Sequence, residues 1–509
     1  MTHLAYQAPG KPLELETDYV VVGSGAGGAT AAVTLARAGA QVVLIEAGPW
    51  RDPPDYPSSV YGTMRDMFDD FGALLARGRA LWPIVQGALV GGSTVINSAI
   101  CVRTPGDVFA RWQRERGVGG EVMARALGDI QDELERELFA EEVPEAALGR
   151  SNRMAMEASR ALRFEAHYTT RYVRGCEGRG HCLQGCRAAR KQSLNVNFVP
   201  ELIARGGTVL SCAPVDRVSF EGSRASAVHG RFRKPVSRER GAVFSVHARR
   251  GVAIAASVVH SPLILHRSGV RPRALGQLFR AHPGAGVLGL YDDPIDMNSG
   301  ATQGWSSLEF RDEPGFKLET LSLPLDMLAG RLPGGGLELM QRLEDFRRLA
   351  MWVVGVRAES AGTIRPGPFG GPVVRYSLDR ADMLRLRAGL VQVARMHVAR
   401  GARAILPVIS GLPYSLAPDE LGVLENAPLD PRAYIAILSH LFGGCAMGSD
   451  PASSVCDGWG RVHDREGLYV VDASVIPTNL GVNPQHTIMA LARLFARRML
   501  DEPANASRS

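Results

Sequence analysis

Three glycines near the N-terminus have the spacing that brings a backbone close to a phosphate. They lie in the segment DYVVVGSGAGGATAAVTLARAGAQVVLIE, residues 18–46. In a G-x-G-x-x-G turn, Gly23 makes the tight turn, Gly25 lets the backbone approach a pyrophosphate, and Gly28 lets helix and strand pack closely. Glu46, about 20 residues further on, can accept hydrogen bonds from ribose hydroxyls. The segment predicts a dinucleotide site, and because a carboxylate at position 46 disfavours a 2′-phosphate, FAD and NAD remain the candidates.

The residues around this turn predict the elements that hold it. Residues 19–22 are a short β-branched run, which is typical of a buried strand, and residues 41–45 form a second such run. Between them, residues 30–37 are rich in Ala and Leu at helical spacing, and Gly39 stands where a helix C-cap belongs. Strand, helix, strand and acid in this order indicate a Rossmann-type unit.

Length and composition narrow the class of protein. The chain has 509 residues, of which 45% are hydrophobic and 22% charged, as expected for a soluble enzyme of two or three domains. The net charge of +6 comes almost entirely from arginine, since Lys11, Lys191, Lys234 and Lys317 are the only lysines. No basic stripe is interleaved with aromatic residues, so we expect no nucleic-acid partner.

The sequence also indicates where the protein is located. Its N-terminus lacks the charged-then-apolar pattern of a signal peptide. The longest nearly apolar stretch, residues 251–265, is too short to cross a bilayer. Seven cysteines in so long a chain do not form a disulfide framework. We therefore expect a cytoplasmic protein without a membrane span.

Several other segments have interpretable patterns. Residues 51–80 have the proline content of a loop, and residues 107–165 have the charge pattern of a helical surface lobe. In residues 87–105, adjacent glycines at 91 and 92 would let the backbone run flat against a planar ligand.

Asp379 is expected to be the N-cap of an amphipathic helix that ends at Gly401. The inward residues of that helix would be Met383, Leu386, Leu390 and Val393.

From about residue 18 to residue 499, the sequence resembles the glucose–methanol–choline family of FAD-dependent oxidoreductases. Besides the glycine turn, the resemblance rests on VGGSTVINSAICVRTP at 90–105 and SVVHSPLILHRSGV at 257–270. It also rests on HLFGGCAMG at 440–448 and GLYVVDASVIPTNLGVNPQHT at 467–487. The similar branch is that of bacterial alcohol oxidases and dehydrogenases with a Gly/Cys-rich segment.

The resemblance implies an α/β fold (α+β overall) with two interleaved domains. A Rossmann-like FAD-binding domain would be assembled from residues 13–105, 193–282 and 430–502. A substrate-binding cap domain, with an antiparallel sheet covered by helices, would comprise residues 106–192 and 283–429.

The resemblance also favours FAD over NAD. Some members carry the flavin on a histidine at the position of Ile96, which has no nucleophile, so the FAD is expected to be non-covalent. The residues expected to contact FAD are Gly23, Gly25, Ala26, Gly28, Glu46, Ala47, Gly92, Ser93, Asn97, Val215, Asp472, Ala473 and Asn483. No metal is expected.

The expected reaction is the oxidation of an alcohol, with an apolar small molecule as substrate. A histidine suits removal of the hydroxyl proton because its pKa lies near neutrality, while hydride leaves the carbon for flavin N5. By resemblance, His440 is this base and Asn483 the second catalytic group, with His486 as an alternative. The pair His282–Pro283 resembles a family segment that shapes the domain junction. The electron acceptor is left open between oxygen and another carrier.

Two alternatives for the reaction remain at this point. The same fold and FAD could serve lyase, isomerase or photodecarboxylase chemistry, or the protein could bind flavin without catalysis. The intact pair of His440 and Asn483 favours an enzyme. Residues 321–340, with three consecutive glycines at 334–336, could form a lid over an apolar pocket.

A cluster of three cysteines has no role in the expected oxidation of an alcohol. Cys176, Cys182 and Cys186 lie in GCEGRGHCLQGC. Their spacing fits a ferredoxin frame, but Arg179 occupies the second ligand position. With His181 they could hold zinc. We interpret the segment as the Gly/Cys-rich turn of the long-chain alcohol oxidase-like branch.

Overall fold

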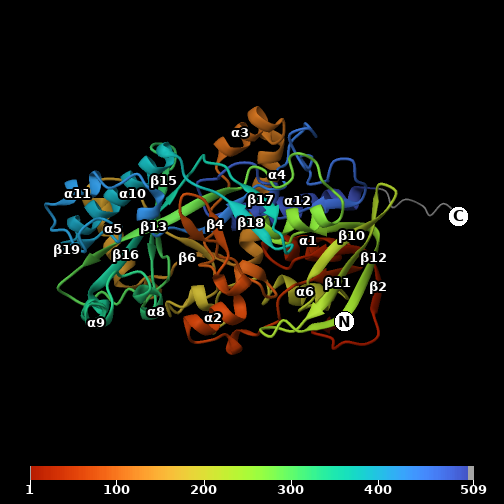
Figure 1. The fold of residues 1–509 in the computed structure, drawn as a ribbon, viewed down its shortest axis with the longest axis horizontal. Coiled ribbons are helices and arrows are strands. Elements are labelled where there is room, and N and C mark those ends of the chain that lie inside the picture. The colour runs from red at the N-terminus through yellow and green to blue at the C-terminus, as the bar shows by residue number, and fades with distance from the viewer. Residues whose placement is uncertain (1, 503–509) are drawn as a thin grey trace.

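The glycine turn follows a strand at the centre of a large mixed sheet. The computed structural model describes residues 2–502, and Figure 1 shows this sheet at one end of an elongated molecule. β2 is parallel to both of its neighbours, β3 and β12, whereas β10, β11 and β12 form an antiparallel meander. The strand order is β1 (Thr2–Leu4), β9 (Thr208–Leu210), β3 (Val42–Ile45), β2 (Leu13–Val22), β12 (Arg240–Ile254), β11 (Arg224–Arg233) and β10 (Val215–Glu221), with β21 (Leu468–Val470) paired to β12.

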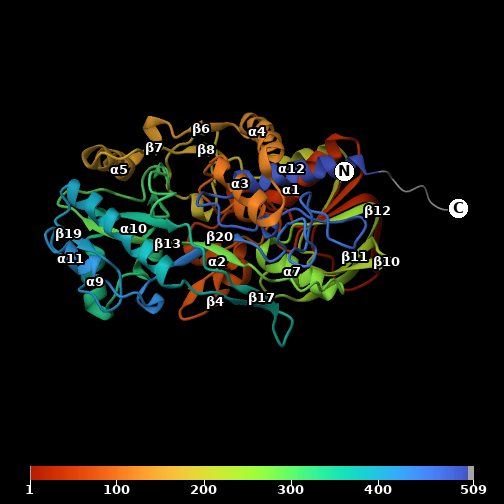
Figure 2. The same ribbon diagram turned by 90° about the horizontal axis from the view of Figure 1, so that it is seen from above.

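Helices pack on this sheet through small side chains. α1 (Ala26–Arg37) is buried over ten of its twelve residues, and it lies beside α12 (Gln485–Asp501), as Figure 2 also shows. Its alanines and glycines allow close approach to the sheet and to α12. The predicted strand–helix–strand unit is confirmed, with α1 beginning at Ala26, earlier than the predicted residue 30.

A second, antiparallel sheet forms the other end of the molecule. α10 (Arg380–Ala399) covers it, and the side chain of Asp379 accepts a hydrogen bond from the Asp382 amide as the predicted N-cap. All four predicted inward residues of α10 are buried. The strand order is β19 (Ala404–Leu406), β13 (Arg280–Leu290), β16 (Leu349–Val356), β15 (Phe316–Leu321), β14 (Trp305–Ser307) and β7 (His167–Tyr168), with β20 (Ile437–Phe442) paired to β13. The mixed α/β fold class is thereby confirmed.

The loop expected at residues 51–80 contains a helix instead. α2 (Val60–Met67) is capped by Ser59, whose side chain accepts from the Gly62 amide. The proline-rich residues before it obscured this short helix in the sequence pattern. The following β4 (Leu75–Arg77) joins a small sheet with β5 (Leu81–Pro83), β17 (Thr363–Pro366) and β18 (Pro372–Arg375).

The two expected domains interlock more closely than their sequence segments suggest. α3 (Gly106–Arg116) and α4 (Gly120–Glu137), expected in the cap, contribute to the same hydrophobic core as the first sheet. β20, expected in the FAD-binding domain, pairs with β13 of the second sheet. The domain boundaries therefore remain a prediction. The remaining elements that bear on the site are β8 (Thr170–Tyr172), α7 (Ser257–Arg267), α8 (Leu325–Ala329) and α9 (Gly336–Glu344).

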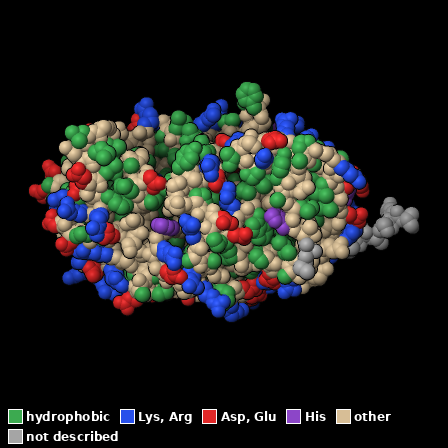
Figure 3. All heavy atoms as spheres, turned by 90° about the horizontal axis from the view of Figure 1, so that it is seen from below, with side chains coloured by type: hydrophobic (Ala, Val, Ile, Leu, Met, Phe, Trp, Pro, Cys, Tyr) green, Lys and Arg blue, Asp and Glu red, His purple; other side chains and the backbone are tan. Residues whose placement is uncertain are grey.

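Figure 3 shows one face on which basic and acidic side chains are interspersed among hydrophobic ones. Over residues 2–502, none of the helices combines the length and apolar character that a membrane crossing requires.

Candidate active site

A single large cavity extends from the glycine turn of the first sheet to the second sheet. Its volume is about 1540 Å³, well above the roughly 300–1000 Å³ of a typical small-molecule pocket. Gly25 lines one part of it, and His440 and Asn483 line another. The space is sufficient for a dinucleotide and a second molecule together.

The glycine turn has the shape of a phosphate cradle. A Cβ added at Gly23 would lie 2.1 Å from the Ala255 carbonyl oxygen, and one at Gly28 would lie 1.8 Å from the Gly23 oxygen. These two glycines are required by the fold itself. At Gly25 the nearest atom would be Gly92 Cα at 4.0 Å, so this position is open on the protein side. Gly25 is also the N-cap of α1 without any side-chain cap, which leaves amide donors of the first turn for an anion.

Glu46 lies at the end of β3, buried beside the turn. Its Oε2 accepts from the amide and hydroxyl of Ser24 at 2.9 and 2.7 Å, and its Oε1 accepts from the Gly48 amide at 2.9 Å. Burial raises the pKa of this carboxyl, and these hydrogen bonds oppose the rise. A carboxylate has about four acceptor positions, so Glu46 retains capacity for a ribose hydroxyl.

Asp472 follows β21 and lies beside the glycine turn, since a Cβ added at Gly27 would be 3.2 Å from the Asp472 Cα. Its Oδ2 accepts from the Ser257 amide at 3.0 Å and the Ser261 hydroxyl at 2.5 Å, while its Oδ1 accepts from the Ser474 amide at 2.8 Å. These bonds tie the first turn of α7 to the turn that contains Ala473. Asp472 is therefore a buried structural carboxylate that also lines the cavity.

Most of the residues expected to contact FAD lie on the cavity wall. Gly28 is the exception, because it packs α1 against β2 as its place in the motif requires. Asn97 lines the cavity with its Nδ2 donating to Gln485 Oε1 at 2.5 Å, and Ile96 lines it as well. The lining residues among those expected are Gly23, Gly25, Ala26, Glu46, Ala47, Gly92, Ser93, Asn97, Val215, Asp472, Ala473 and Asn483.

His440 lies on β20 next to a second histidine. A β-bulge near His282 in the pairing of β13 with β20 brings the two side chains together, with 3.4 Å between their Nδ1 atoms. Burial, followed by the charges of Lys317 and His282, lowers the pKa of His440 well below its usual range. Burial and Lys317 lower the pKa of His282 to about 3. Both rings are therefore neutral at physiological pH.

Asn483 is fixed by a buried cation. Lys317, on β15 and 1% exposed, donates from Nζ to Asn483 Oδ1 and to Glu319 Oε1, each at 2.5 Å. Glu319 in turn accepts from Gln303 at 3.0 Å. All four residues line the cavity. Burial lowers the pKa of Lys317, whereas the ion pair with Glu319 opposes this shift.

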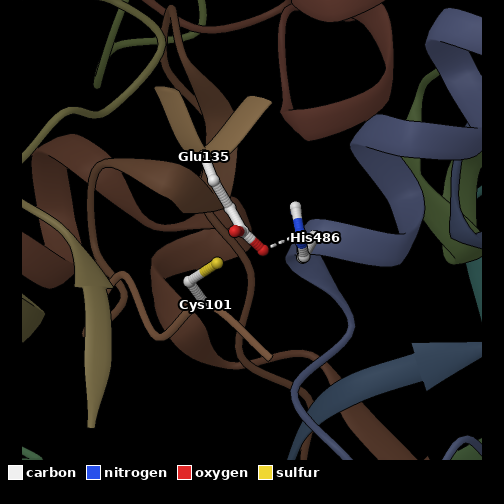
Figure 4. Close-up of side chains that lie close together, drawn as sticks. All are labelled: Cys101, Glu135 and His486. Atoms are coloured by element: carbon white, nitrogen blue, oxygen red, sulfur yellow. Dashed lines mark hydrogen bonds and ion pairs between the residues drawn. The ribbon is translucent and has the colours of Figure 1, made fainter. Parts of the chain in front are cut away.

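His486, the alternative second group, lies elsewhere. Figure 4 shows it with Glu135 and Cys101, all within 4.8 Å of one another through their ligating atoms. The ring is fully buried on α12, where Nε2 lies 3.1 Å from Glu135 Oε1 and Nδ1 is hydrogen-bonded to Tyr172. Both ring nitrogens thus have partners, and Arg103 pairs with Glu135 at 2.7 Å.

Because His486 faces α4 and does not line the cavity, the structure does not bring it to His440. The reason is the start of α12. Asn483 precedes the helix and faces the cavity, whereas His486, inside the first turn, faces the opposite side. Asn483 remains the candidate second group.

Sequence reasoning missed three residues of this site: His282 as a neighbour of His440, and the pair Lys317 and Glu319. The rarity of lysine was a usable signal for Lys317, which is one of only four lysines in the chain. Arginine could supply the same charge, so a lysine in an arginine-rich sequence indicates a site that needs the compact ammonium group. No local signal identifies Glu319.

Comparisons with known proteins identify the family of this chain. Residues 17–284 and 358–492 match the N- and C-terminal family models of the GMC oxidoreductases. A GMC-type oxidoreductase of Mycobacterium tuberculosis, named as uncharacterised, is 34% identical over 95% of this chain and 76% of its own length. A long-chain-alcohol oxidase of Arabidopsis thaliana is 25% identical over 96% of this chain and 67% of its own.

Solved structures show the same fold. A formate oxidase of Aspergillus oryzae studied for FAD modification superposes with a TM-score of 0.71 at 17% identity, covering 96% of this chain and 99% of that one. Pyridoxine 4-oxidase from Mesorbium loti superposes with a TM-score of 0.68 at 18% identity, covering 96% and 100%. The chain belongs to the GMC oxidoreductase family and is an FAD-dependent oxidoreductase.

Proposed function

We propose that this protein oxidises an apolar alcohol to the corresponding aldehyde or ketone, with non-covalently bound FAD. The observation that carries the proposal is the arrangement of one cavity. The glycine turn and Glu46 lie along one part of it, and neutral His440 lies with Asn483 along another. The similarity to long-chain-alcohol oxidases supports the same chemistry.

His440 is the proposed base for the hydroxyl proton. If its Nδ1–H donates to Nδ1 of His282, Nε2 of His440 carries a free lone pair for the substrate. His282 then has its proton on Nε2, which lies toward the Gly355 backbone. FAD, when bound, supplies the acceptor for the hydride that leaves the carbinol carbon. His282 is in this account a positioning residue that fixes the tautomer of the base.

Asn483 is the proposed hydrogen-bond donor to the substrate oxygen. Because Lys317 occupies its Oδ1, the amide must present Nδ2 as the free donor. The ammonium of Lys317 places positive charge behind that donor, where negative charge develops as the hydroxyl proton leaves. Lys317 thereby orients Asn483 and keeps His440 neutral.

Replacement of Lys317 by methionine tests this role. Since the cation lowers the pKa of His440, its loss should move that pKa upward. Activity requires the neutral ring, so the acidic limb of the kcat/KM profile should shift to higher pH by about one unit, with kcat reduced roughly tenfold. The measurement is the pH profile of both proteins, with the exposed Lys11→Met as control. An unchanged acidic limb in folded, FAD-loaded K317M contradicts the assignment.

An apolar substrate fits the wall beyond the histidines. The second sheet and the segment after β15 contribute Leu321, Leu323, Met327 and Met351 to the cavity. Met327 lies in α8, within the segment expected to form a lid, and the three glycines precede or begin α9. We propose that this segment covers the tail of a long-chain or ring-type alcohol, as the alcohol oxidase relatives suggest.

Non-covalent FAD is proposed from the residue at position 96. Ile96 lines the cavity and has no atom that could bond to the flavin. Acid or heat precipitation should therefore release all flavin into the supernatant, as measured by its fluorescence. Yellow protein pellets that keep their flavin after washing with denaturant would show a covalent bond instead.

The experiment that tests the proposed function is anaerobic reduction of the bound flavin. A panel of primary and secondary alcohols of increasing chain length is mixed with the oxidised protein, and carboxylic acids of matched length serve as controls. Long-chain alcohols should bleach the flavin and yield the carbonyl product, whereas the acids should not. Conversion of substrate without flavin bleaching would support lyase or isomerase chemistry. Readmission of air or of artificial carriers then shows which acceptor reoxidises the flavin.

A further inference from the structure

The cysteine cluster surrounds two buried cations. Cys182 is buried at the start of a single 3-10 turn, and Cys176 and Cys186 are half-buried on either side. All seven cysteines of the chain are free. Within residues 2–502, the one group of three side chains whose ligand atoms converge closely enough to hold a metal ion is Cys101, Glu135 and His486. The sulfur atoms of Cys176, Cys182 and Cys186 do not converge in this way.

The first cation is Arg171 of β8, whose side chain is fully buried. Its Nη2 lies 3.0 Å from Cys182 Sγ, its Nη1 lies 3.9 Å from Cys176 Sγ, and its Nε donates to the Ser98 carbonyl at 2.7 Å. A nitrogen–sulfur distance of 3.0 Å is short and is typical of a charge-assisted contact. Two of the three cysteines thus share one guanidinium.

The second cation is Lys191, which is 2% exposed. Its Nζ donates to the carbonyls of Val95, Asn97 and Cys182 at 2.6, 2.7 and 3.0 Å. Together with Arg171, it holds the backbone of residues 95–98, a segment that lines the cavity. Carbonyl oxygens satisfy the donors of both cations but do not neutralise their charge.

Neither cation has a carboxylate partner among the described residues. Glu177, the one acid in the sequence between Cys176 and Cys186, is exposed and pairs with Arg179 and Arg190. The ionisable groups that face Arg171 and Lys191 are the thiols of Cys176, Cys182 and Cys186. Because two unpaired buried charges are costly, the two cations favour the anionic form of one of these thiols.

Cys182 fits this requirement better than its neighbours. Burial alone would raise the pKa of its thiol, but the charges of Arg171 and Lys191 outweigh burial and lower the pKa to about 7. The hydroxyl of Thr302 contributes to this lowering of the pKa. Lys191, whose pKa falls to about 8 through burial despite the nearby thiols, still carries its proton at neutral pH.

We propose that Cys182 is a thiolate that serves as the counter-ion of Arg171 and Lys191, and that it is the site at which peroxides oxidise this protein. In this step the thiolate sulfur attacks one oxygen of hydrogen peroxide and the O–O bond breaks. Hydroxide leaves and takes up a proton to become water. Sulfur loses two electrons and becomes a sulfenic acid, while peroxide is reduced.

Cys182 is 9% exposed, and the two residues after it, Leu183 and Gln184, line the cavity wall. The proposal requires that hydrogen peroxide, which is small and uncharged, reaches the sulfur from this wall. The proposal does not depend on the substrate of the enzyme or on its electron acceptor.

The first test is the ultraviolet thiolate absorbance of the FAD-loaded protein between pH 5.5 and 8.5. The difference between wild type and Cys182→Ser should show a step of one thiolate with its midpoint near pH 7. Cys456→Ser, which removes a buried cysteine that faces no cation, should retain the whole step. Identical titrations of wild type and C182S would overturn the thiolate assignment.

The second test uses the wild-type holoenzyme alone, so it does not depend on the folding of a variant. Hydrogen peroxide is added for a set time and removed with catalase, the protein is then unfolded in the presence of dimedone, and the adducts are located by mass spectrometry. The adduct at Cys182 should form roughly tenfold faster than at the more exposed Cys176 and Cys186, because the thiolate is the reactive form. Adducts confined to Cys176 and Cys186 would overturn the proposal.

Discussion

Replacement of His440 by alanine should reduce kcat for alcohol oxidation roughly 100- to 10,000-fold, the range typical of a lost general base. The variant should remain folded and yellow, because no hydrogen bond to the glycine turn involves this ring. The measurement is the anaerobic rate of flavin bleaching by a saturating alcohol. Since burial and Lys317 keep His440 neutral, the wild-type rate should be insensitive to pH down to well below 6.5.

A histidine outside the cavity provides the matched control. His229 on β11 is hydrogen-bonded to Ser245 and Ser219 and does not line the cavity, so His229→Ala should keep the wild-type bleaching rate. An H440A protein that bleaches as fast as wild type would falsify the role of His440. If H440A instead lost its FAD, His440 would belong to cofactor binding rather than to proton transfer.

Replacement of Gly25 by alanine should weaken FAD binding roughly 100-fold, about 2.7 kcal/mol, without unfolding the protein. Gly25 has a φ of −69°, which alanine adopts freely, and its Cβ would meet no protein atom nearer than 4.0 Å. The added methyl group enters only the space where the pyrophosphate is expected. Titration of apoprotein with FAD, followed by flavin fluorescence, measures the affinity.

Gly128→Ala is the control for this change, because a Cβ there meets nothing within 4 Å and the residue lies inside α4. Its FAD affinity should equal that of wild type. Unchanged affinity in folded G25A would mean that the cofactor phosphates lie elsewhere. By contrast, Gly28→Ala should disturb folding itself, since its Cβ would collide with the Gly23 carbonyl.

The parts of the fold that were predictable depend on local patterns. The strand before Gly23, the acid after β3 and the cap of α10 each follow from spacing within a few residues. His440 is identified differently, because its motif at 440–448 resembles that of the family. Such signals require no knowledge of which strands pair.

The remainder of the site depends on pairing between distant strands. Lys317 and Glu319 alternate on β15, a pattern that normally indicates a solvent-facing side, yet all of residues 316–320 are buried. Their burial follows from the position of β15 inside the second sheet, next to β16. His282 meets His440 only through the β13–β20 register and its bulge, which no local pattern indicates.

The most direct measurement of the proposed function is the visible flavin absorbance of the wild-type holoenzyme mixed anaerobically with a long-chain primary alcohol. The proposal predicts complete loss of the oxidised flavin band, with one equivalent of aldehyde formed per FAD and a rate that falls when His440 is replaced. An oxidised band that persists with every primary and secondary alcohol, in folded and FAD-saturated protein, would contradict it.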